Sequence, residues 1–252
     1  MGVRECQVAG KFLVINELED VYDSVTGRAL TGSWVWGSAL VLSEWMATKG
    51  RDLFHFQDKT VLELGAGVGL PGLTAALLGA SRVVLTDTAP LVPALVKNVE
   101  ANGLQDRVEV RELVWGSDEF PSRPGDLGEF DLVLMSDVFY DAEEMAGLAK
   151  TLKRVCGKET VVWAASEVRP WTAECLSVLA CQGIGVVEWP SPLGREEGLD
   201  LSAVFHLILP NEDTDVEAMG RTLFLDFSRK KLRKLQEHRK SDCPPTLGLC
   251  EE

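Results

Sequence analysis

Two acids and a run of glycines between residues 60 and 87 could hold a nucleotide-like cofactor. Glu63 stands two residues before the first glycine in TVLELGAGVGLPGLTAALLGASRVVLTD. The turn that follows it consists of Gly65, Ala66, Gly67 and Gly69. Glycines let the backbone approach a ligand closely. Asp87 lies about twenty residues beyond the turn, the usual position of an acid that binds ribose hydroxyls.

Two classes of cofactor fit this arrangement. NAD-dependent enzymes use a G-x-G-x-x-G turn to seat a pyrophosphate, and Leu70 stands where the third glycine would be. The negative charge of Glu63 would oppose a pyrophosphate, but it would suit a cofactor with a cationic amino group. S-adenosylmethionine is such a cofactor, so the sequence favours a methyltransferase over a dehydrogenase.

A second set of reactive residues is Asp137-Val138-Phe139-Tyr140, at the end of the apolar run DLVLMS. Methyl transfer from a sulfonium is an in-line displacement that needs a neutral, well-oriented nucleophile. The Asp137 carboxylate could orient a lysine amine and hold its positive charge as the bond forms, and the Tyr140 ring could pack against the lysine. The alternatives are a helix N-cap for Asp137 and a core ring for Tyr140.

The elements that must position these residues alternate along the chain. Helices are predicted from residue 70 and over 90–101, 142–156 and 171–182; strands are predicted over 61–64, 83–87, 108–113, 130–136, 160–165, 184–189 and 203–209. This alternation predicts an α/β, Rossmann-like sheet of seven strands, mainly parallel, with helices on both faces. The last two strands have no helix between them and should supply one antiparallel strand. Ligands are then expected at the carboxyl ends of the strands.

The N-terminal part precedes this alternation. An amphipathic helix is predicted over 38–47, after strand-like pieces at 11–17 and 28–32. We expect one domain overall, in which residues 1–50 are a prelude that covers the cofactor edge and residues 51–210 are the methyltransferase core. Residues 211–252 are expected to form a basic helix and a flexible tail.

Length and composition fit one ordinary globular domain. The chain has 252 residues, of which 46% are hydrophobic and 25% charged. Its six cysteines include no C-x-x-C pair, which argues against a zinc site or a disulfide scaffold, and no metal is expected. The first residues lack the apolar stretch of a secretory signal, and no apolar run approaches membrane-spanning length. We therefore expect a cytoplasmic or nuclear monomer that does not enter a membrane.

Charge is unevenly distributed. The net charge is -14, but residues 229–240 carry about +6, which leaves about -20 elsewhere. An acidic body repels nucleic acid and attracts a basic polypeptide, although acidic proteins are common in the cytosol. The basic stretch is predicted to be a solvated terminal helix. Nuclear import, contact with an acidic partner and docking on the acidic body are alternatives for it.

Five motifs in order carry a resemblance to a known family. They are TGSWVWGSALVLSEW, VLELGAGVGLPGL, LTD, ELVWGS and SDVFY. The set resembles the eukaryotic seven-β-strand protein methyltransferases with a D-x-x-Y motif, most of whose characterised members methylate lysine. The resemblance covers roughly residues 30–209, and its specificity lies in the combination, because each motif alone also occurs by chance.

The resemblance implies roles for particular residues. Asp137 and Tyr140 would be catalytic. The cofactor-binding residues would be Trp36, Glu63, Gly65, Ala66, Gly67, Gly69, Asp87, Trp115 and Ser136. Among these, the acid and glycines of the turn would line the methionine part, Asp87 would hold the ribose, Trp115 would lie near the adenine and Trp36 would close the pocket from the N-terminal side. Packing in the core is the alternative for both tryptophans, and a helix cap or a surface partner is the alternative for Glu63.

The absence of a motif narrows the range of substrates that the sequence predicts. No Asn- or Asp-Pro-Pro-Tyr run follows the fourth strand of the core, which makes a nucleic acid substrate less expected. Residues 166–169 are candidate substrate contacts or ordinary surface loop, and His206 is expected to be a core histidine. The predicted function is methylation of a lysine on a nonhistone protein by S-adenosylmethionine. Arginine or histidine acceptors, or a non-catalytic cofactor-binding interaction module, are the alternatives.

Overall fold

Seven strands form the central sheet in the computed structural model, which describes residues 2–18, 22, 27, 31–118, 130–189 and 202–210. They are β3 (Thr60–Leu64), β4 (Arg82–Asp87), β5 (Val108–Glu112), β6 (Leu132–Ser136), β7 (Val161–Glu167), β8 (Gly185–Trp189) and β9 (Ser202–Ile208). Each corresponds to a predicted strand within two residues. The predicted C-terminal helix and tail, 211–252, lie outside the described residues.

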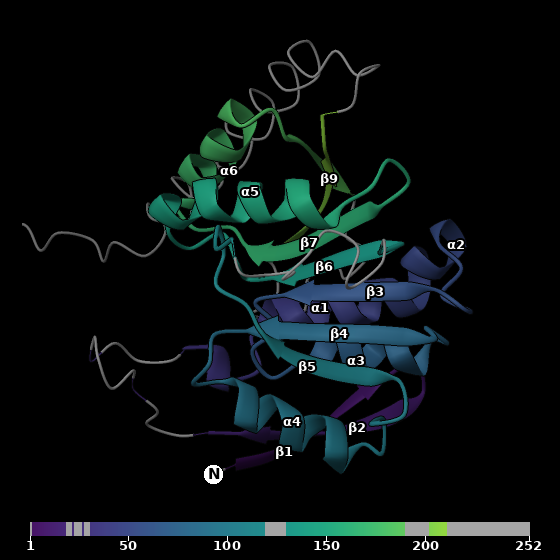
Figure 1. Cartoon of the computed structure of the whole chain (residues 1–252). Helices are drawn as coiled ribbons and strands as arrows, with labels where there is room; N and C mark the ends of the chain where they lie inside the picture. Colours follow the sequence, from purple (N-terminus) through teal and green to yellow (C-terminus); the bar gives the residue numbers. More distant parts are fainter. Residues whose placement is uncertain are drawn as a thin grey trace, which may run out of the picture.

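The order of the strands is β5-β4-β3-β6-β7-β9-β8 (Figure 1). Neighbours pair in parallel from β5 to β7, while β9 is antiparallel to both β7 and β8. The predicted mainly parallel sheet with one antiparallel strand is therefore confirmed. The chain moves outward from β3 to β5 and then returns to β6 beside β3, and such a reversal opens a crevice at the carboxyl ends of the strands.

Alternating side chains divide the core into two layers. Val61, Leu132 and Trp163 point to one face of the sheet, and Leu62, Val133 and Val162 point to the other. The helices are α1 (Gly37–Trp45), α2 (Arg51–Leu53), α3 (Leu70–Leu77), α4 (Val92–Ala101), α5 (Met145–Val155) and α6 (Thr172–Cys181). In Figure 1, α1 and α3 lie behind the strands, whereas the buried residues of α5 and α6 belong to the second layer. None of these described helices is long and apolar enough to cross a membrane.

The predicted helix at 38–47 is longer than expected. A π-helical turn, Met46–Gly50, and α2 continue α1 without a break. A Cβ on Gly50 would lie 3.0 Å from the Trp45 ring, so glycine there leaves room for the indole. Trp45 packs edge-on against Trp163 and Trp189, with ring centroids 4.7 and 5.8 Å apart. These aromatic contacts attach the helix to one face of the sheet.

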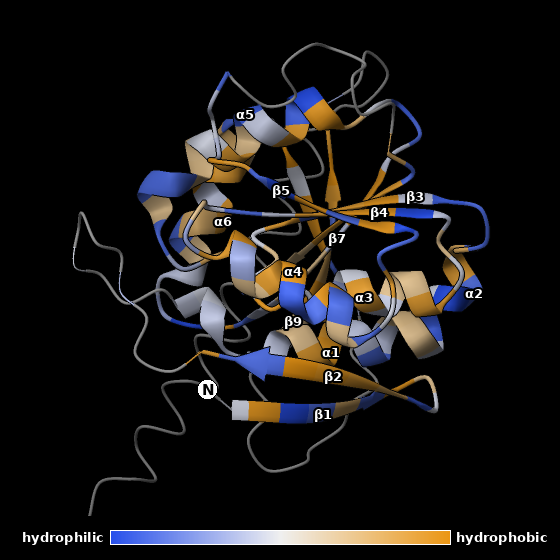
Figure 2. Cartoon of the chain, turned by 60° about the horizontal axis from the view of Figure 1, so that its bottom comes forward, coloured by the Kyte–Doolittle hydropathy of each residue, from blue (hydrophilic) through white to orange (hydrophobic). Residues whose placement is uncertain are grey.

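A hairpin outside the main sheet precedes α1. Its strands are β1 (Gly2–Val8), which was not predicted, and β2 (Lys11–Glu17), which was. Asn98 of α4 and Asn102, which directly follows α4, bond the β2 backbone, accepting from the amides of Asn16 and Val14 at 2.8 Å each. These side chains satisfy backbone groups at the edge of β2. The hairpin therefore lies against α4 (Figure 2).

The strand predicted over 28–32 is wrong where it is described. Thr31–Ser33 forms a 3₁₀ turn. A Cβ on Gly32 would lie 2.6 Å from Leu91 Cδ1 and 3.2 Å from the Gly67 Cα, so this segment packs directly on the glycine turn. The close approach needs glycine, because a Cβ would collide with the Leu91 side chain and the Gly67 backbone.

Candidate functional site

A pocket of about 860 Å³ opens at the carboxyl ends of the parallel strands. Nine of the eleven predicted site residues line it, namely Trp36, Gly65, Ala66, Gly67, Asp87, Trp115, Ser136, Asp137 and Tyr140. They come from the segment before α1 and from the loops after β3, β4, β5 and β6. The fold thus gathers residues more than 100 positions apart into one cavity. Glu63 and Gly69 are the two predicted residues outside its lining.

The glycine turn and Asp87 are joined directly. The Gly67 amide donates to Asp87 Oδ2 at 2.7 Å, and the Thr88 amide donates to Asp87 Oδ1 at 2.7 Å. Burial raises the pKa of Asp87, and these hydrogen bonds partly offset that rise. The Thr88 hydroxyl also donates to Oδ1, at 3.3 Å, whereas among the described residues Oδ2 accepts only from the Gly67 amide, so a hydroxyl donor of a ligand can still bind Oδ2.

Gly67 has φ = +56°, and a Cβ there would lie 2.7 Å from the Gly32 carbonyl oxygen. Gly67→Ala should push the segment 31–33 off the turn and weaken binding of S-adenosylhomocysteine, measured by calorimetry, by about tenfold or more (~1.4 kcal/mol). Gly103→Ala is the matched control, because Gly103 has φ = +64° with no neighbour within 4 Å. Equal affinities in the two variants would contradict a close contact at the turn.

Glu63 lies beneath the turn rather than in the pocket. Strand alternation in β3 points its side chain toward α3, where it is fully buried and Oε2 accepts from the Gly72 amide at 2.9 Å. Burial raises the pKa of Glu63 to about 8, with a smaller contribution from the charge of Asp87. This contact agrees with the helix-capping alternative for Glu63, because the carboxyl group accepts a hydrogen bond from an amide in the first turn of α3. Its other oxygen, Oε1, has no hydrogen-bond partner.

Close packing surrounds Gly69, which does not line the pocket. It precedes α3 with φ = +83°, and a Cβ would lie 2.7 Å from Leu95 Cδ1 and 3.0 Å from Leu85 Cδ1. The left-handed backbone and the crowding both require glycine. The residue therefore shapes the start of the helix behind the pocket.

Two aromatic pairs form walls of the cavity. Trp36 and Trp34 meet edge to face with centroids 6.4 Å apart, and the Trp36 Nε1 donates to the Thr31 carbonyl at 2.8 Å. Trp115 and Tyr140 lie 6.5 Å apart, and a Cβ on Gly65 would lie 3.0 Å from the Trp115 ring. Trp115 therefore covers the backbone of the glycine turn. Trp36 and Trp115 are both partly buried, and Trp115 also packs against the second layer of the core, so the core-packing alternative holds in part for Trp115.

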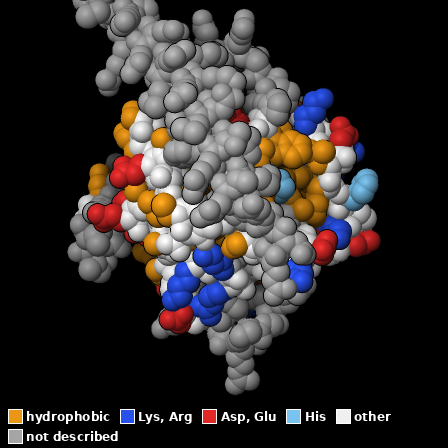
Figure 3. Space-filling model, turned by 90° about the horizontal axis from the view of Figure 1, so that it is seen from above, with side chains coloured by type: hydrophobic (Ala, Val, Ile, Leu, Met, Phe, Trp, Pro, Cys, Tyr) orange, Lys and Arg blue, Asp and Glu red, His pale blue; other side chains and the backbone are white. Residues whose placement is uncertain are grey.

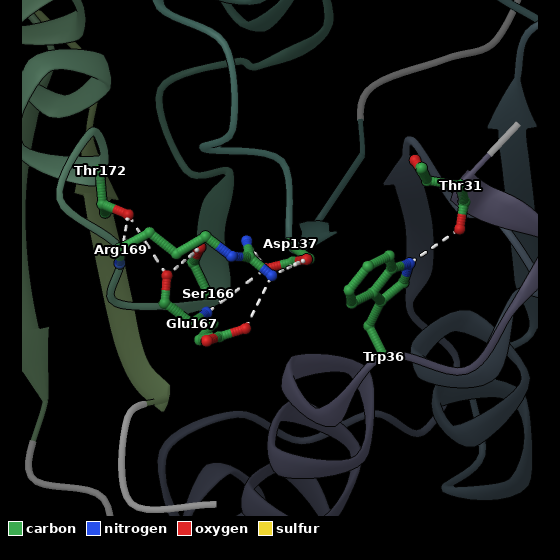
Figure 4. Close-up of polar contacts among 7 residues, drawn as sticks. All are labelled: Thr31, Trp36, Asp137, Ser166, Glu167, Arg169 and Thr172. Atoms are coloured by element: carbon green, nitrogen blue, oxygen red, sulfur yellow. Dashed lines mark hydrogen bonds and ion pairs between the residues drawn. The ribbon is translucent and has the colours of Figure 1, made fainter. Parts of the chain in front are cut away.

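Asp137, which follows β6 and lines the pocket, is held by a largely buried ion pair. Its oxygens accept from Arg169 Nη1 and Nη2 at 2.9 Å each, and the two side chains are only 7% and 14% exposed (Figure 4). The Asp137 backbone has φ = +57°, uncommon outside glycine, and its amide donates to the Ala165 carbonyl at 2.8 Å. The helix-capping alternative does not hold, because Asp141 caps the following turn.

Tyr140 projects from the loop after β6 and is 52% exposed, so it is not a core ring. Loss of water around the phenol, and then the charges of Glu144 and Asp87, raise the pKa of Tyr140 to about 12. The hydroxyl therefore stays protonated at neutral pH. It can donate a hydrogen bond or present an aromatic face, but it cannot serve as a base.

Several lining residues were not predicted. They are Thr31, Gly32, Trp34, Thr88, Glu144 and Trp171, together with apolar neighbours of the turns. Trp34 could have been suspected from its place in TGSWVWGS, two residues before Trp36. Of the candidate substrate contacts at 166–169, Glu167 and Arg169 line the pocket, whereas the Ser166 side chain is buried.

The cavity suits a nucleoside cofactor with an amino acid group. Its volume is within the range of about 300–1,000 Å³ typical of small-molecule sites. The glycine turn leaves a cradle that a Cβ would fill, and the orphaned Glu63 Oε1 lies within the wall behind it. Nothing in the residues present conflicts with the cofactor predicted from the sequence.

Charged groups around the pocket are mainly acidic. Asp87, Asp137, Glu144 and Glu167 line it, and Arg169 is the only basic residue among the described lining. The described surface visible in Figure 3 mixes acidic, basic and hydrophobic side chains and presents no continuous basic face. In the part of the chain that the structure describes, no three His, Cys, Asp or Glu side chains are grouped so as to hold a metal ion.

Solved structures share the fold at low sequence identity. The ribosomal protein L11 methylase of Lactobacillus delbrueckii is 17% identical with a TM-score of 0.52, over 77% of this chain and 92% of that one. The glycopeptide N-methyltransferase MtfA is 13% identical with a TM-score of 0.53, over 68% and 90% of the two chains. These likenesses confirm the predicted class I methyltransferase sheet and say nothing about the acceptor.

Sequence relatives are closer. Mouse METTL21A, a protein N-lysine methyltransferase, is 38% identical over 138 residues, which are 54% of this chain and 60% of the relative. EFM7 of Gibberella zeae, a protein N-terminal and lysine N-methyltransferase, is 32% identical over 160 residues, which are 56% and 59% of the two chains. The matches thus span about 60% of the length of these relatives.

A family described as lysine methyltransferase matches residues 20–175, more than half of the chain. The match confirms the resemblance carried by the five sequence motifs. It also favours S-adenosylmethionine, the predicted cofactor, over NAD. The chain belongs to the lysine methyltransferase family.

Proposed function

We propose that this protein is an S-adenosylmethionine-dependent methyltransferase that modifies a lysine side chain of a nonhistone protein. The observation that carries the proposal is one continuous pocket. Cofactor-type residues, the glycine turn and Asp87, line it together with Asp137, Tyr140 and Glu167. Methyl donor and acceptor must meet within one cavity for in-line transfer, and membership of the family supports the same reaction.

The chain's own residues would orient both partners. The turn at 65–67, Asp87, Trp36 and Trp115 would hold S-adenosylmethionine, which supplies an electrophilic methyl group on a sulfonium. Carboxylates at the other end of the pocket would attract an ammonium group and stabilise the charge that develops on nitrogen. The Tyr140 ring would pack against the lysine stem. The lysine would lose its proton to water, because Asp137 is already paired with Arg169.

The surroundings of the pocket support a macromolecular acceptor. Four of its lining residues are exposed large hydrophobic side chains, namely Trp34, Val114, Tyr140 and Trp171. Exposed apolar side chains that gather at one place mark interaction sites. With the acidic lining and the net charge of -14, they suit a basic segment of a protein rather than nucleic acid.

The carboxylates would also accept a guanidinium or imidazole, so arginine and histidine remain the alternative acceptors. A cofactor-binding module without turnover is the alternative from another class. Product analysis separates them: peptides labelled in the reaction are sequenced by mass spectrometry, and a methyl group on arginine or histidine would overturn the proposed acceptor.

Binding and transfer can be tested in sequence. S-adenosylhomocysteine at 100 times its Kd should stabilise the protein by about 2.7 kcal/mol, seen as a raised melting temperature, whereas NAD should have no effect. Tritiated S-adenosylmethionine incubated with the protein and a lysate that lacks it should then label a discrete protein band. Stabilisation without any label would support the non-catalytic module, and stabilisation by NAD instead would overturn the cofactor.

A further inference from the structure

Arg169 connects three parts of the pocket that are far apart in sequence. It lies in the loop between β7 and α6, and its backbone amide donates to Thr172 Oγ1 at 3.0 Å. Its guanidinium holds both oxygens of Asp137 and also donates to Glu167 Oε2 at 2.7 Å (Figure 4). The guanidinium carbon lies 5.5 Å from the centre of the Trp36 ring.

The geometry is that of a fixed clamp rather than of a mobile surface cation. A planar guanidinium can donate two parallel hydrogen bonds to one carboxylate and still present a face to an indole, which a lysine cannot do. Burial lowers the pKa of Arg169, but hydrogen bonds and charges from Asp137 and Glu167 more than offset this and raise it. Removing one partner would leave the other as a poorly solvated charge, so the pair should persist when an acceptor binds.

The clamp also reaches the N-terminal side of the pocket. Trp36 Nε1 is bonded to the Thr31 carbonyl, so the indole closes a short loop of residues 31–36. Gly32, in the same loop, packs against Gly67 of the glycine turn. The guanidinium therefore contacts, through Trp36, the segment that borders the cofactor part of the pocket, and it contacts the acceptor part through Asp137.

We propose that Arg169 is a positioning residue for methyl transfer: its guanidinium fixes the Asp137 carboxylate and the Trp36 indole relative to each other, and so aligns the acceptor end with the cofactor end. The inference rests on the proposed function for its catalytic consequence. Asp137 then acts as a charge-compensated, oriented hydrogen-bond acceptor and not as a free counter-ion. The acceptor ammonium meets Glu144, the Glu167 oxygen that Arg169 does not hold, and the aromatic walls.

Arg169→Ala and Arg169→Lys test the clamp, with Arg111→Ala as the matched control. Arg111 also donates through Nε and Nη2 to one carboxylate, Glu109, at 3.1 and 2.8 Å, but on the surface of β5 away from the pocket. The first measurement needs no acceptor: amide hydrogen exchange of residues 31–36 and 137–140. Arg169→Ala should speed exchange in both segments about tenfold, and Arg111→Ala should leave both unchanged.

The second measurement is the initial rate of tritium transfer from S-adenosylmethionine to a fixed amount of lysate protein. Arg169→Ala should lower this rate about 100-fold. Arg169→Lys should reach less than about a tenth of the wild-type rate, because lysine cannot donate the two parallel hydrogen bonds of a guanidinium. Guanidinium added at millimolar concentration should restore part of the rate that Arg169→Ala loses. It should not change the rate of the Arg111→Ala control.

Each other outcome overturns the inference. Full activity in Arg169→Lys would mean that charge alone suffices, and a faster rate in Arg169→Ala would mean that Arg169 competes with the acceptor. Unchanged amide hydrogen exchange in both segments would show that Arg169 does not hold them in place. If the wild-type protein transfers no methyl group, the proposed function fails, while the exchange experiment still decides whether Arg169 fixes the two walls.

Discussion

Asp137→Asn should lower the rate of methyl transfer by about 100- to 1,000-fold, the usual cost of removing one oriented electrostatic contact from an active site. The amide is nearly isosteric and tolerates the left-handed backbone at φ = +57°. It lacks the charge and one of the two oxygens that Arg169 holds at 2.9 Å. The carboxylate would therefore be lost both as an acceptor contact and as the partner of the clamp.

The rate is measured with tritiated S-adenosylmethionine, and the Kd of S-adenosylhomocysteine is measured by calorimetry. Cofactor affinity should stay within about threefold of wild type, since Asp137 lies at the acceptor end. Asp141→Asn is the control: Asp141 belongs to the same loop, but it caps the turn at Glu143 and does not line the pocket. Asp137→Asn with more than a third of wild-type activity would remove Asp137 from the mechanism.

Glu63→Gln should change how stability depends on pH. The folded protein holds the Glu63 proton up to about pH 8, whereas in the unfolded chain the carboxyl group loses it near pH 4.5. Between these values the folded state binds more protons than the unfolded state, so the free energy of unfolding falls as pH rises. The loss approaches ~5 kcal/mol when integrated over that window at about 1.4 kcal/mol per pH unit.

Glutamine carries no titrating proton, so its variant should lack this fall. Urea unfolding at pH 5, 7 and 9 should show Glu63→Gln gaining on wild type by a few kcal/mol toward high pH, through the avoided cost of a buried charge. Glu112→Gln, at the exposed end of β5, should follow the wild-type curve. Parallel curves for Glu63→Gln and wild type would show that burial does not hold a proton on this residue.

The sheet was predictable because its signals are local. Apolar runs of strand length alternated with helical spacing, and each predicted strand of the sheet was found within two residues. The hairpin-like pairing of β8 with β9 followed from the missing helix between the last two strands, whereas the place of β9 between β7 and β8 was not predicted. β1 was missed, because in GVRECQV only Cys6 and Val8 are buried and the hairpin depends on side chains of α4.

The sequence predicted which residues line the site better than it predicted what each of them does there. Nine residues named from motifs line the pocket, since strand ends in a parallel sheet converge. Glu63 was expected to face the cofactor, but period-two alternation in β3 turns it toward α3. Asp137 was expected to be available to the acceptor, but Arg169 occupies both of its oxygens. No sequence pattern between residues 137 and 169 indicates that these two residues form an ion pair.

Residue type and spacing along the chain determined the alternating strands and helices, the glycine turn and the family to which the protein belongs. The strands, the helices and the turn depend on neighbours close in sequence, and the family depends on the order of several such local motifs, so all of these can be read without a structure. Tertiary structure decided the partners of the charged groups: the buried Glu63, the bonds between Asp87 and the turn, and the clamp from Arg169 to Asp137 and Trp36. Charge pairing and pKa depend on burial and on contacts between distant segments, which only the folded chain brings together.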